Sequence, residues 1–160
     1  MTIKIRKMHI DDIKAVQHIA EVSWNRTYDG IIPLTVQNIF LAVAYSEEML
    51  MKRLKMTPFF VVEEHGELIG FANFSPVKEN GEIELSAIYI LPEAQHKGVG
   101  TQLLTYGLAN LKPNRICLNV ESENTIGKNF YYAKGFKFIE EFDEDFNGYR
   151  LKTTRMALEI

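Results

Sequence analysis

The stretch that decides the fold reads Ile83-Glu-Leu-Ser-Ala-Ile-Tyr-Ile-Leu91 and, after Pro92-Glu-Ala, Gln95-His-Lys-Gly-Val-Gly-Thr101. The first part predicts a strand that ends before Pro92. The second part opens a helix predicted over 98–111, whose apolar residues recur at helical spacing. Glycines at a helix start let the backbone approach a ligand closely, and the N–H groups there point outward at the positive end of the helix dipole. This order of strand, loop and helix start suits a pyrophosphate.

Several interpretations of this glycine-rich loop compete. A P-loop requires GxxxxGK[ST], which the chain does not contain. A dinucleotide fingerprint GxGxxG matches Gly98 and Gly100 but meets Leu103 at the third glycine, although Glu121 stands near the expected acidic position. A turn that binds nothing is the plain structural alternative. The pattern (Gln/Arg)-x-x-Gly-x-(Gly/Ala) after a strand fits in full, and it is similar to the acyl-CoA pyrophosphate loop of the GNAT superfamily of N-acyltransferases.

A second motif strengthens this resemblance. The stretch Asn124-Thr-Ile-Gly-Lys-Asn-Phe-Tyr-Tyr-Ala-Lys-Gly-Phe136 resembles the superfamily signature Asn-x-x-Ala-x-x-(Phe/Leu)-Tyr-x-x-x-Gly-Phe. Gly127 stands where alanine is usual, which is expected to lower local helix stability rather than function. Two motifs in the right order, each on a suitable predicted element, disfavour the ligand-free turn. The resemblance also covers the earlier strands, and it implies an acyltransferase enzyme.

Changes of hydrophobic period outside the motifs predict the remaining elements. In chain order we expect a strand near 3–5, a helix from 11–12 to about 28, helical sequence over 35–55, strands at 59–63, 68–74 and 83–91, a helix at 98–111, a strand at 115–120, a helix at 124–134, and strands at 136–142 and 149–158. The helical sequence is expected to break near Tyr45, with Ser46 capping a new start. The order β-αα-βββ-α-β-α-ββ predicts an α/β mixed sheet flanked by helices, GNAT-like and centrally splayed by resemblance, with residues 1–160 as one domain.

Composition narrows the class of protein. The chain has 160 residues, of which 46% are hydrophobic and 24% charged, and its net charge is −3. These values are typical of a soluble globular protein and disfavour a nucleic-acid partner. No apolar run is long enough to span a bilayer and residues 1–10 lack a signal peptide's apolar core, so we expect a cytoplasmic protein without a membrane partner. Cys117 is interpreted as a buried strand residue, and the four histidines lack metal-ligand spacing, so no metal is expected.

The resemblance implies acetyl-CoA as the co-substrate. The strand at 86–90 would separate from the strand that begins near Arg115, and its freed backbone groups would pair with the pantetheine arm. A backbone N–H in this strand would also polarise the thioester carbonyl. The loop amides would hold the pyrophosphate, with Lys97 either adding charge or remaining solvated. The implied cofactor-binding residues are Ile88, Tyr89, Ile90, Gln95, His96, Lys97, Gly98, Val99, Gly100, Thr101, Asn124, Lys128 and Tyr131.

Catalysis requires a proton donor for the departing thiolate and a proton acceptor for the amine. By resemblance, Tyr131 is the candidate general acid because a phenol is protonated at neutral pH, while Tyr132 points elsewhere on the helix. The alternative for Tyr131 is a packing role. An alkyl ammonium must lose a proton before it attacks, and relatives often place a base carboxylate where Glu84, the first choice, and Glu82 stand. Two surface carboxylates are the alternative. No cysteine or serine nucleophile with a neighbouring base is evident, so we expect direct attack in a ternary complex.

The resemblance places the acceptor pocket between the first two helices and the last hairpin, with Trp24, Tyr28 and Asp29 as candidate substrate-binding residues. The acids at 140–145 would attract a cationic amine, or they form a solvated turn. A faint similarity of 40–54 to bacterial polyamine acetyltransferases favours a small cationic amine such as a polyamine. A peptide or protein amino group and a non-catalytic acyl-CoA sensor are the alternatives, with a dinucleotide-binding oxidoreductase third. Relatives also suggest a homodimer through the C-terminal strands.

Overall fold

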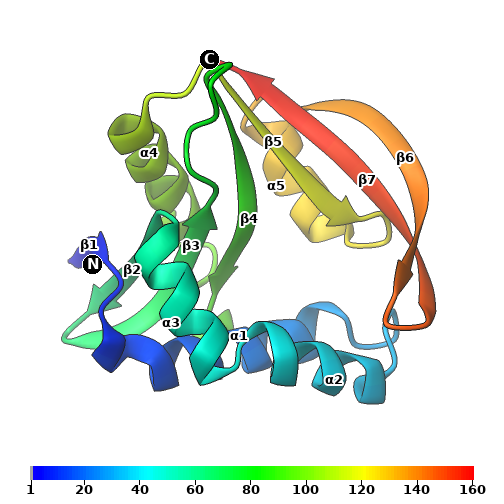
Figure 1. The fold of residues 1–160 in the computed structure, drawn as a ribbon, viewed down its shortest axis with the longest axis horizontal. Helices are drawn as coiled ribbons and strands as arrows, with labels where there is room; N and C mark the ends of the chain where they lie inside the picture. Colours follow the sequence, from blue (N-terminus) through cyan, green and yellow to red (C-terminus); the bar gives the residue numbers. More distant parts are fainter. Residues whose placement is uncertain (1) are drawn as a thin grey trace.

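The computed structural model describes residues 2–160. Its strands form one seven-stranded sheet in the order β1-β2-β3-β4-β5-β7-β6, with helices on both faces (Figure 1). The elements are β1 (Ile3–Lys7), α1 (Ile13–Thr27), α2 (Leu34–Ala44), α3 (Glu47–Met56), β2 (Phe59–Glu64), β3 (Glu67–Phe74), β4 (Glu82–Ile90), α4 (Val99–Leu111), β5 (Arg115–Glu121), α5 (Thr125–Ala133), β6 (Lys137–Phe146) and β7 (Tyr149–Glu159), with short 3-10 turns at Ile10–Asp12 and Pro92–Ala94. The predicted mixed α/β fold is confirmed.

Local sequence explains where two of the helices begin. The Ser46 hydroxyl accepts a hydrogen bond from the Met49 amide (3.1 Å), so α3 starts after the break predicted there. In the same way, the Asn124 side chain accepts from the Gly127 amide (2.9 Å) at the start of α5. These two caps determine where α3 begins after α2 and where α5 begins after β5.

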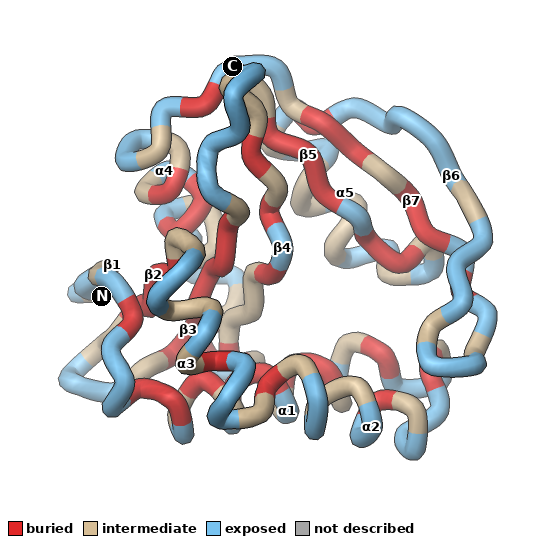
Figure 2. The backbone as a smooth tube through the Cα atoms, in the orientation of Figure 1, coloured by how far each residue is buried: buried red, intermediate tan, exposed pale blue. Residues whose placement is uncertain are grey.

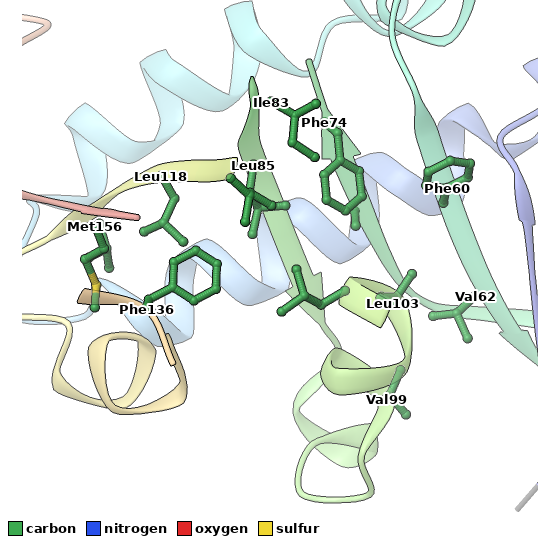
Figure 3. Packing of buried hydrophobic residues seen from close by; sticks show 14 of the residues in the cluster. Phe60, Val62, Phe74, Ile83, Leu85, Val99, Leu103, Leu118, Phe136 and Met156 are labelled. Carbon is green, nitrogen blue, oxygen red and sulfur yellow. The ribbon is translucent and has the colours of Figure 1, made fainter. Parts of the chain in front are cut away.

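Two hydrophobic layers hold the sheet between its helices. On one face, α4 packs through Leu103 against Phe74, Ile83 and their neighbours, and the layer continues to Met156 on β7 (Figure 3). On the other face, α1 and α3 cover β2 and β3, with Val16 among the fully buried residues. Each of these strands is therefore buried on both faces, which explains their near-continuous apolar sequences. Over residues 2–160, no helix is long and apolar enough to cross a membrane.

The sheet divides between β4 and β5 (Figure 1). These strands pair in parallel only over 82–84 and 115–117. Further along, β4 continues to pair with β3, and β5 continues to pair with β7. The backbone groups of 86–90 that face β5 therefore have no strand partner, and a ligand can pair with them. This divergence is the splay that the resemblance implies.

A β-bulge at Ser86 reorients the part of β4 beside this gap. Residues 73–74 of β3 oppose Ala87 and Leu85, which leaves Ser86 without an opposite residue. Both Leu85 before the bulge and Ile88 after it pack on the α4 face, whereas Ala87 packs on the α1 face. The extra residue thus reverses the strand's alternation where the sheet opens.

The edge strand β6 is far more exposed than its neighbours (Figure 2). It continues to Phe146, paired with β7 throughout, rather than ending at Phe142 as the sequence pattern predicts. Asp and Glu are depleted in strands, so an acidic run is typical of a turn. Here the pairing with β7 extends the strand through 140–145 despite that composition.

Candidate active site

The space between the divergent strands is a cavity of about 640 Å³, here named the splay cavity. Most of the predicted cofactor-binding residues line it, namely Ile88, Tyr89, Ile90, Gln95, His96, Gly98, Val99, Gly100, Thr101, Asn124 and Tyr131. The rest of its lining is Ser23, Arg26 and Thr27 of α1, Tyr28 directly after α1, Leu85, Ser86 and Ala87 of β4, Ala94 of the 3-10 turn, Asn119 and Val120 of β5, and Ile126, Gly127, Phe130, Ala133 and Lys134. The structure therefore brings both motifs and the open edge of β4 to one cavity.

The loop before α4 presents backbone amides to the splay cavity. His96 and Gly98 adopt left-handed conformations, with φ of +64° and +78°. The Gln95 side-chain amide donates to the Ile90 carbonyl (3.1 Å), which ties the loop to the end of β4. Amides in the first turn of a helix have no partner within it, and here that turn lines the cavity. The helix start is thus placed as an anion site.

The charge of the splay cavity matches such a ligand. Among the described residues, no Asp or Glu lines it, whereas Arg26 and Lys134 do. The other two predicted cofactor-binding residues, Lys97 and Lys128, lie outside the lining. Lys97 is exposed, and the Lys128 ammonium donates to the Ser122 carbonyl (3.2 Å). A lining without carboxylates suits a polyanion such as a CoA pyrophosphate.

A second cavity of about 280 Å³ adjoins the first and is here named the aromatic cavity. Its lining is Trp24, Tyr28, Ile32, Phe40, Ala44, Tyr45, Arg53, Ser86, Tyr89, Asn119, Val120, Glu121, Glu144, Phe146, Leu151 and Thr153. The Trp24 ring stacks on Phe40 (centroids 4.4 Å apart) and on Phe146 (5.8 Å). Phe146 ends β6, so the β6–β7 hairpin closes against α1 and α2. The predicted substrate-binding residues Trp24 and Tyr28 line this cavity, whereas Asp29 is exposed and does not.

The two cavities meet at shared residues, namely Tyr28, Ser86, Tyr89, Asn119 and Val120. Tyr131 lines the splay cavity, while Tyr132 is exposed and lines neither. Burial raises the pKa of Tyr28 to about 12, helped by the nearby Glu121 charge. Burial also raises the pKa of Tyr131 well above its ordinary value. Both phenols are therefore protonated at neutral pH and can donate a hydrogen bond or a proton.

The two predicted base carboxylates lie outside both cavities. Glu82 pairs with Arg115 (3.1 Å), and Glu84 pairs with Arg155 (2.7 Å). Both occupy the closed end of the splay, where β4 and β5 still pair. Arg155 comes from β7, and no local pattern in the sequence shows which distant cation will meet a strand carboxylate.

Other carboxylates line the aromatic cavity instead. Glu121, the last residue of β5, is only 9% exposed, and burial raises its pKa. Glu144 is exposed and accepts a hydrogen bond from the Thr153 hydroxyl (3.0 Å), while the other acids at 140–145 line neither cavity. Over residues 2–160, no three His, Cys, Asp or Glu side chains are grouped so as to hold a metal ion.

Sequence reasoning missed several of the lining residues. Arg26 and the C-terminal turn of α1 carry no motif, and Phe40 and Phe146 are indistinguishable in sequence from core residues. The only sequence signal at Glu121 is its distance from the glycine-rich loop, which matches a dinucleotide fingerprint instead. These residues become a site only through the packing of α1, α2 and the last hairpin.

Comparisons with known proteins agree with this geometry. The family described as acetyltransferase (GNAT) domain matches residues 55–138. The spermidine N(1)-acetyltransferase of Thermoplasma acidophilum is 30% identical over 91% of this chain and 95% of its own. The crystal structure of PaiA N-acetyltransferase from Thermoplasma acidophilum, in complex with coenzyme A, superposes with a TM-score of 0.86 at 28% identity and covers 100% of both chains. A GCN5-related N-acetyltransferase from Rhodopseudomonas palustris shares the fold, with a TM-score of 0.81 at 18% identity over 100% of this chain and 97% of its own. The chain is thus an acyltransferase that belongs to the GNAT family of N-acetyltransferases.

Proposed function

We propose that this enzyme transfers the acetyl group of acetyl-CoA to a primary amine of a small cationic molecule, with a polyamine as the first candidate. One observation carries the proposal. A cavity lined by two cations, and by no carboxylate of residues 2–160, shares Tyr28 and Tyr89 with a cavity lined by aromatic rings and two carboxylates. A polyanionic donor and a cationic acceptor would therefore meet at one junction.

Acetyl-CoA fits the splay cavity through main-chain groups. In the proposal, the pyrophosphate binds the amides of Gly98 to Thr101, and the pantetheine amides pair with the unpartnered edge of β4. An N–H of that edge near Ile88 polarises the thioester carbonyl and stabilises the oxyanion that develops there. Asn124, which lines the cavity, already caps α5.

Tyr131 supplies the proton for the departing sulfur. Tyr131 lines the splay cavity, and its raised pKa keeps its hydroxyl protonated. The amine attacks the thioester directly, because the one cysteine, Cys117, is buried and lines neither cavity.

Two acceptor classes have support. The aromatic rings and the carboxylates of Glu121 and Glu144 suit an alkyl ammonium, and the similar Thermoplasma acidophilum protein is named for spermidine. Arg53 favours the second class, a peptide amine, because it lines the same cavity and a guanidinium can donate to a carbonyl oxygen. That guanidinium also lies over the Tyr45 ring at 4.6 Å, so it has a packing role as well.

The test is release of free thiol from acetyl-CoA with a panel of polyamines, amino acids and short peptides. We expect release that depends on the amine and is fastest with a polyamine. Faster turnover of a peptide would assign the second acceptor class. Binding of acetyl-CoA without turnover of any amine would favour a sensor, and failure to bind acetyl-CoA would overturn the proposal.

The homodimer is a further prediction. The edge strand β6 carries two exposed apolar side chains, Phe138 and Ile139, which are 53% and 44% exposed. The unpaired N–H and C=O groups of an exposed edge strand can pair with another chain, and these two apolar side chains would be buried by such pairing. Sedimentation of the purified protein tests this, and a monomer at micromolar concentration would contradict it.

A further inference from the structure

Glu121 is a buried carboxylate without a cation. Among the described residues, the buried acids are Asp12 and Glu121, which are 6% and 9% exposed. Asp12 pairs with Arg6 at 2.8 Å, whereas no Lys, Arg or His nitrogen of residues 2–160 lies within 4.0 Å of the Glu121 carboxylate. The Glu123 amide donates to Glu121 Oε2 (2.8 Å), which satisfies part of its hydrogen-bonding capacity. Burying a charge without a partner of opposite sign is unfavourable, so this position suits a ligand of positive charge.

Glu121 lies next to Val120, one of the residues that the two cavities share. Glu121 lines the aromatic cavity, and Tyr28, whose pKa its charge raises, lines both. Thr153 lies opposite Glu121 on β7, and its hydroxyl is taken up by Glu144. The charged and titratable groups around Glu121 are Tyr28 directly after α1, Tyr45, Arg53 of α3, Tyr89 of β4, Glu123, Lys128 of α5 and Glu144 of β6. Arg53 donates to the Asn73 side chain and to the Ala44 carbonyl, and among residues 2–160 it forms no ion pair with Glu121.

We propose that Glu121 binds the ammonium group of the acceptor and removes the proton that blocks its attack. This inference rests on the proposed function. An N–H bond of the ammonium breaks and its proton moves to the Glu121 carboxylate, which leaves the nitrogen lone pair free. That pair forms the new C–N bond at the thioester carbonyl, and the C–S bond breaks as sulfur receives the Tyr131 proton. The second nitrogen proton restores Tyr131, and Glu121 returns its proton to water, so the reaction releases one proton overall.

The raised pKa of Glu121 supports this role. A carboxylate in water is too weak a base to compete for an alkyl ammonium proton, and burial moves it towards the amine. The same raised pKa lowers the stability of the folded protein once Glu121 is ionised. Because the folded state raises this pKa, the stabilising contribution of the protonated form is lost as the pH rises through the folded value. The ionised Glu121 therefore destabilises the folded protein at neutral pH, and a bound acceptor ammonium would offset this effect.

The test compares Glu121→Gln, an isosteric change that removes the charge, with the wild type, using spermidine as the probe. We expect kcat/KM for spermidine to fall about 10²-fold or more. The Kd for acetyl-CoA should stay within about twofold, because Glu121 does not line the splay cavity. In the wild type, kcat/KM should rise with pH through the Glu121 pKa, and the variant should lose this rise. Its Tm at pH 8 should equal or exceed that of the wild type.

Two further variants keep the result interpretable. Glu123→Gln removes an exposed charge beside Glu121 and should change kcat/KM by no more than about twofold. Glu84→Gln is the rival, because sequence reasoning places the base there. A loss of turnover in Glu84→Gln with near-normal Glu121→Gln would overturn the inference, as would an unchanged pH profile in Glu121→Gln.

Calorimetry of spermidine binding to the CoA complex separates this inference from the proposed function. At least a tenfold weaker Kd in Glu121→Gln supports ammonium binding even if the wild type never turns spermidine over. Equal affinity in the two proteins, or no spermidine binding to the wild type, would overturn it.

Discussion

The two cavities of this enzyme are built in different ways. The splay cavity takes much of its lining from two short motifs and presents backbone amides, and no carboxylate among the described residues lines it. The aromatic cavity takes side chains from helices at the start of the chain and from the hairpin at its end, including two carboxylates. The splay cavity therefore suits a ligand that stays the same among related enzymes. The aromatic cavity can change its specificity through single side chains without altering the fold.

Among the variants that separate catalysis from substrate binding, Tyr131→Phe should have the largest effect on turnover. Loss of the hydroxyl should lower kcat about 10²-fold or more, since the leaving sulfur then lacks its proton donor. The Kd for acetyl-CoA should change little. Single-turnover thiol release measures the first quantity and calorimetry the second. The neighbouring Tyr132→Phe is the control, because Tyr132 is exposed and lines neither cavity. Equal losses of kcat in both variants would show that Tyr131 is not the proton donor.

Gly98→Val should damage the splay cavity alone. A β-branched residue at φ +78° is strained by about 1–2 kcal/mol, and its side chain would stand where the pyrophosphate is proposed. We expect the Kd for acetyl-CoA to rise about tenfold or more. Gly66→Val is the matched control, since Gly66 has φ +81°, lies in the β2–β3 turn and, like Gly98, has nothing within 4 Å of an added Cβ. If both variants lose the same stability and neither loses affinity, the loop does not hold the pyrophosphate.

Phe146→Ala should act on the acceptor side only. The ring stacks on Trp24 and Phe40 and lines the aromatic cavity. Its removal should raise KM for the amine several-fold, on the order of 1 kcal/mol for an aromatic contact, and leave the Kd for acetyl-CoA unchanged. Steady-state kinetics with each substrate varied in turn measures both. A parallel loss of acetyl-CoA affinity would mean that the two cavities do not work separately.

Gly127→Ala should have the smallest effect. Alanine favours helix by up to about 1 kcal/mol, and the family signature usually has it at this position. An added Cβ would lie 2.6 Å from the Asn124 side-chain nitrogen, however, and would disturb the cap that starts α5. A lost cap costs about 1 kcal/mol, so the free energy of unfolding should change by less than about 0.5 kcal/mol. Urea denaturation measures it, and a clear gain in stability would show that the cap tolerates the methyl group.

The fold was within reach of the sequence because its signals are local. Hydrophobic period and the Ser46 cap each act over a few residues, and the structure agrees with them. The predicted end of β6 at Phe142 was wrong because the deciding signal there is not local. Its acidic composition argues for a turn locally, and only pairing with β7 extends the strand to Phe146.

The proposed role of Glu121 could not be predicted in this way. A glutamate next to the reacting strand, such as Glu84, matches the superfamily pattern, but an arginine on β7 pairs with it. Glu121 carries no local signal, and its importance comes from burial, a missing cation and the cavity that it faces. All three are properties of packed elements.

The sequence by itself determined the order of the elements, the glycine-rich helix start that suits a pyrophosphate and the position of Tyr131, since each depends on residues close together in the chain. Only the tertiary structure decided where β4 parts from β5, which carboxylates are paired and which side chains line the acceptor cavity. Those outcomes depend on contacts between α1, β5 and β7, which lie far apart in the chain, and no local pattern encodes which distant residues will meet.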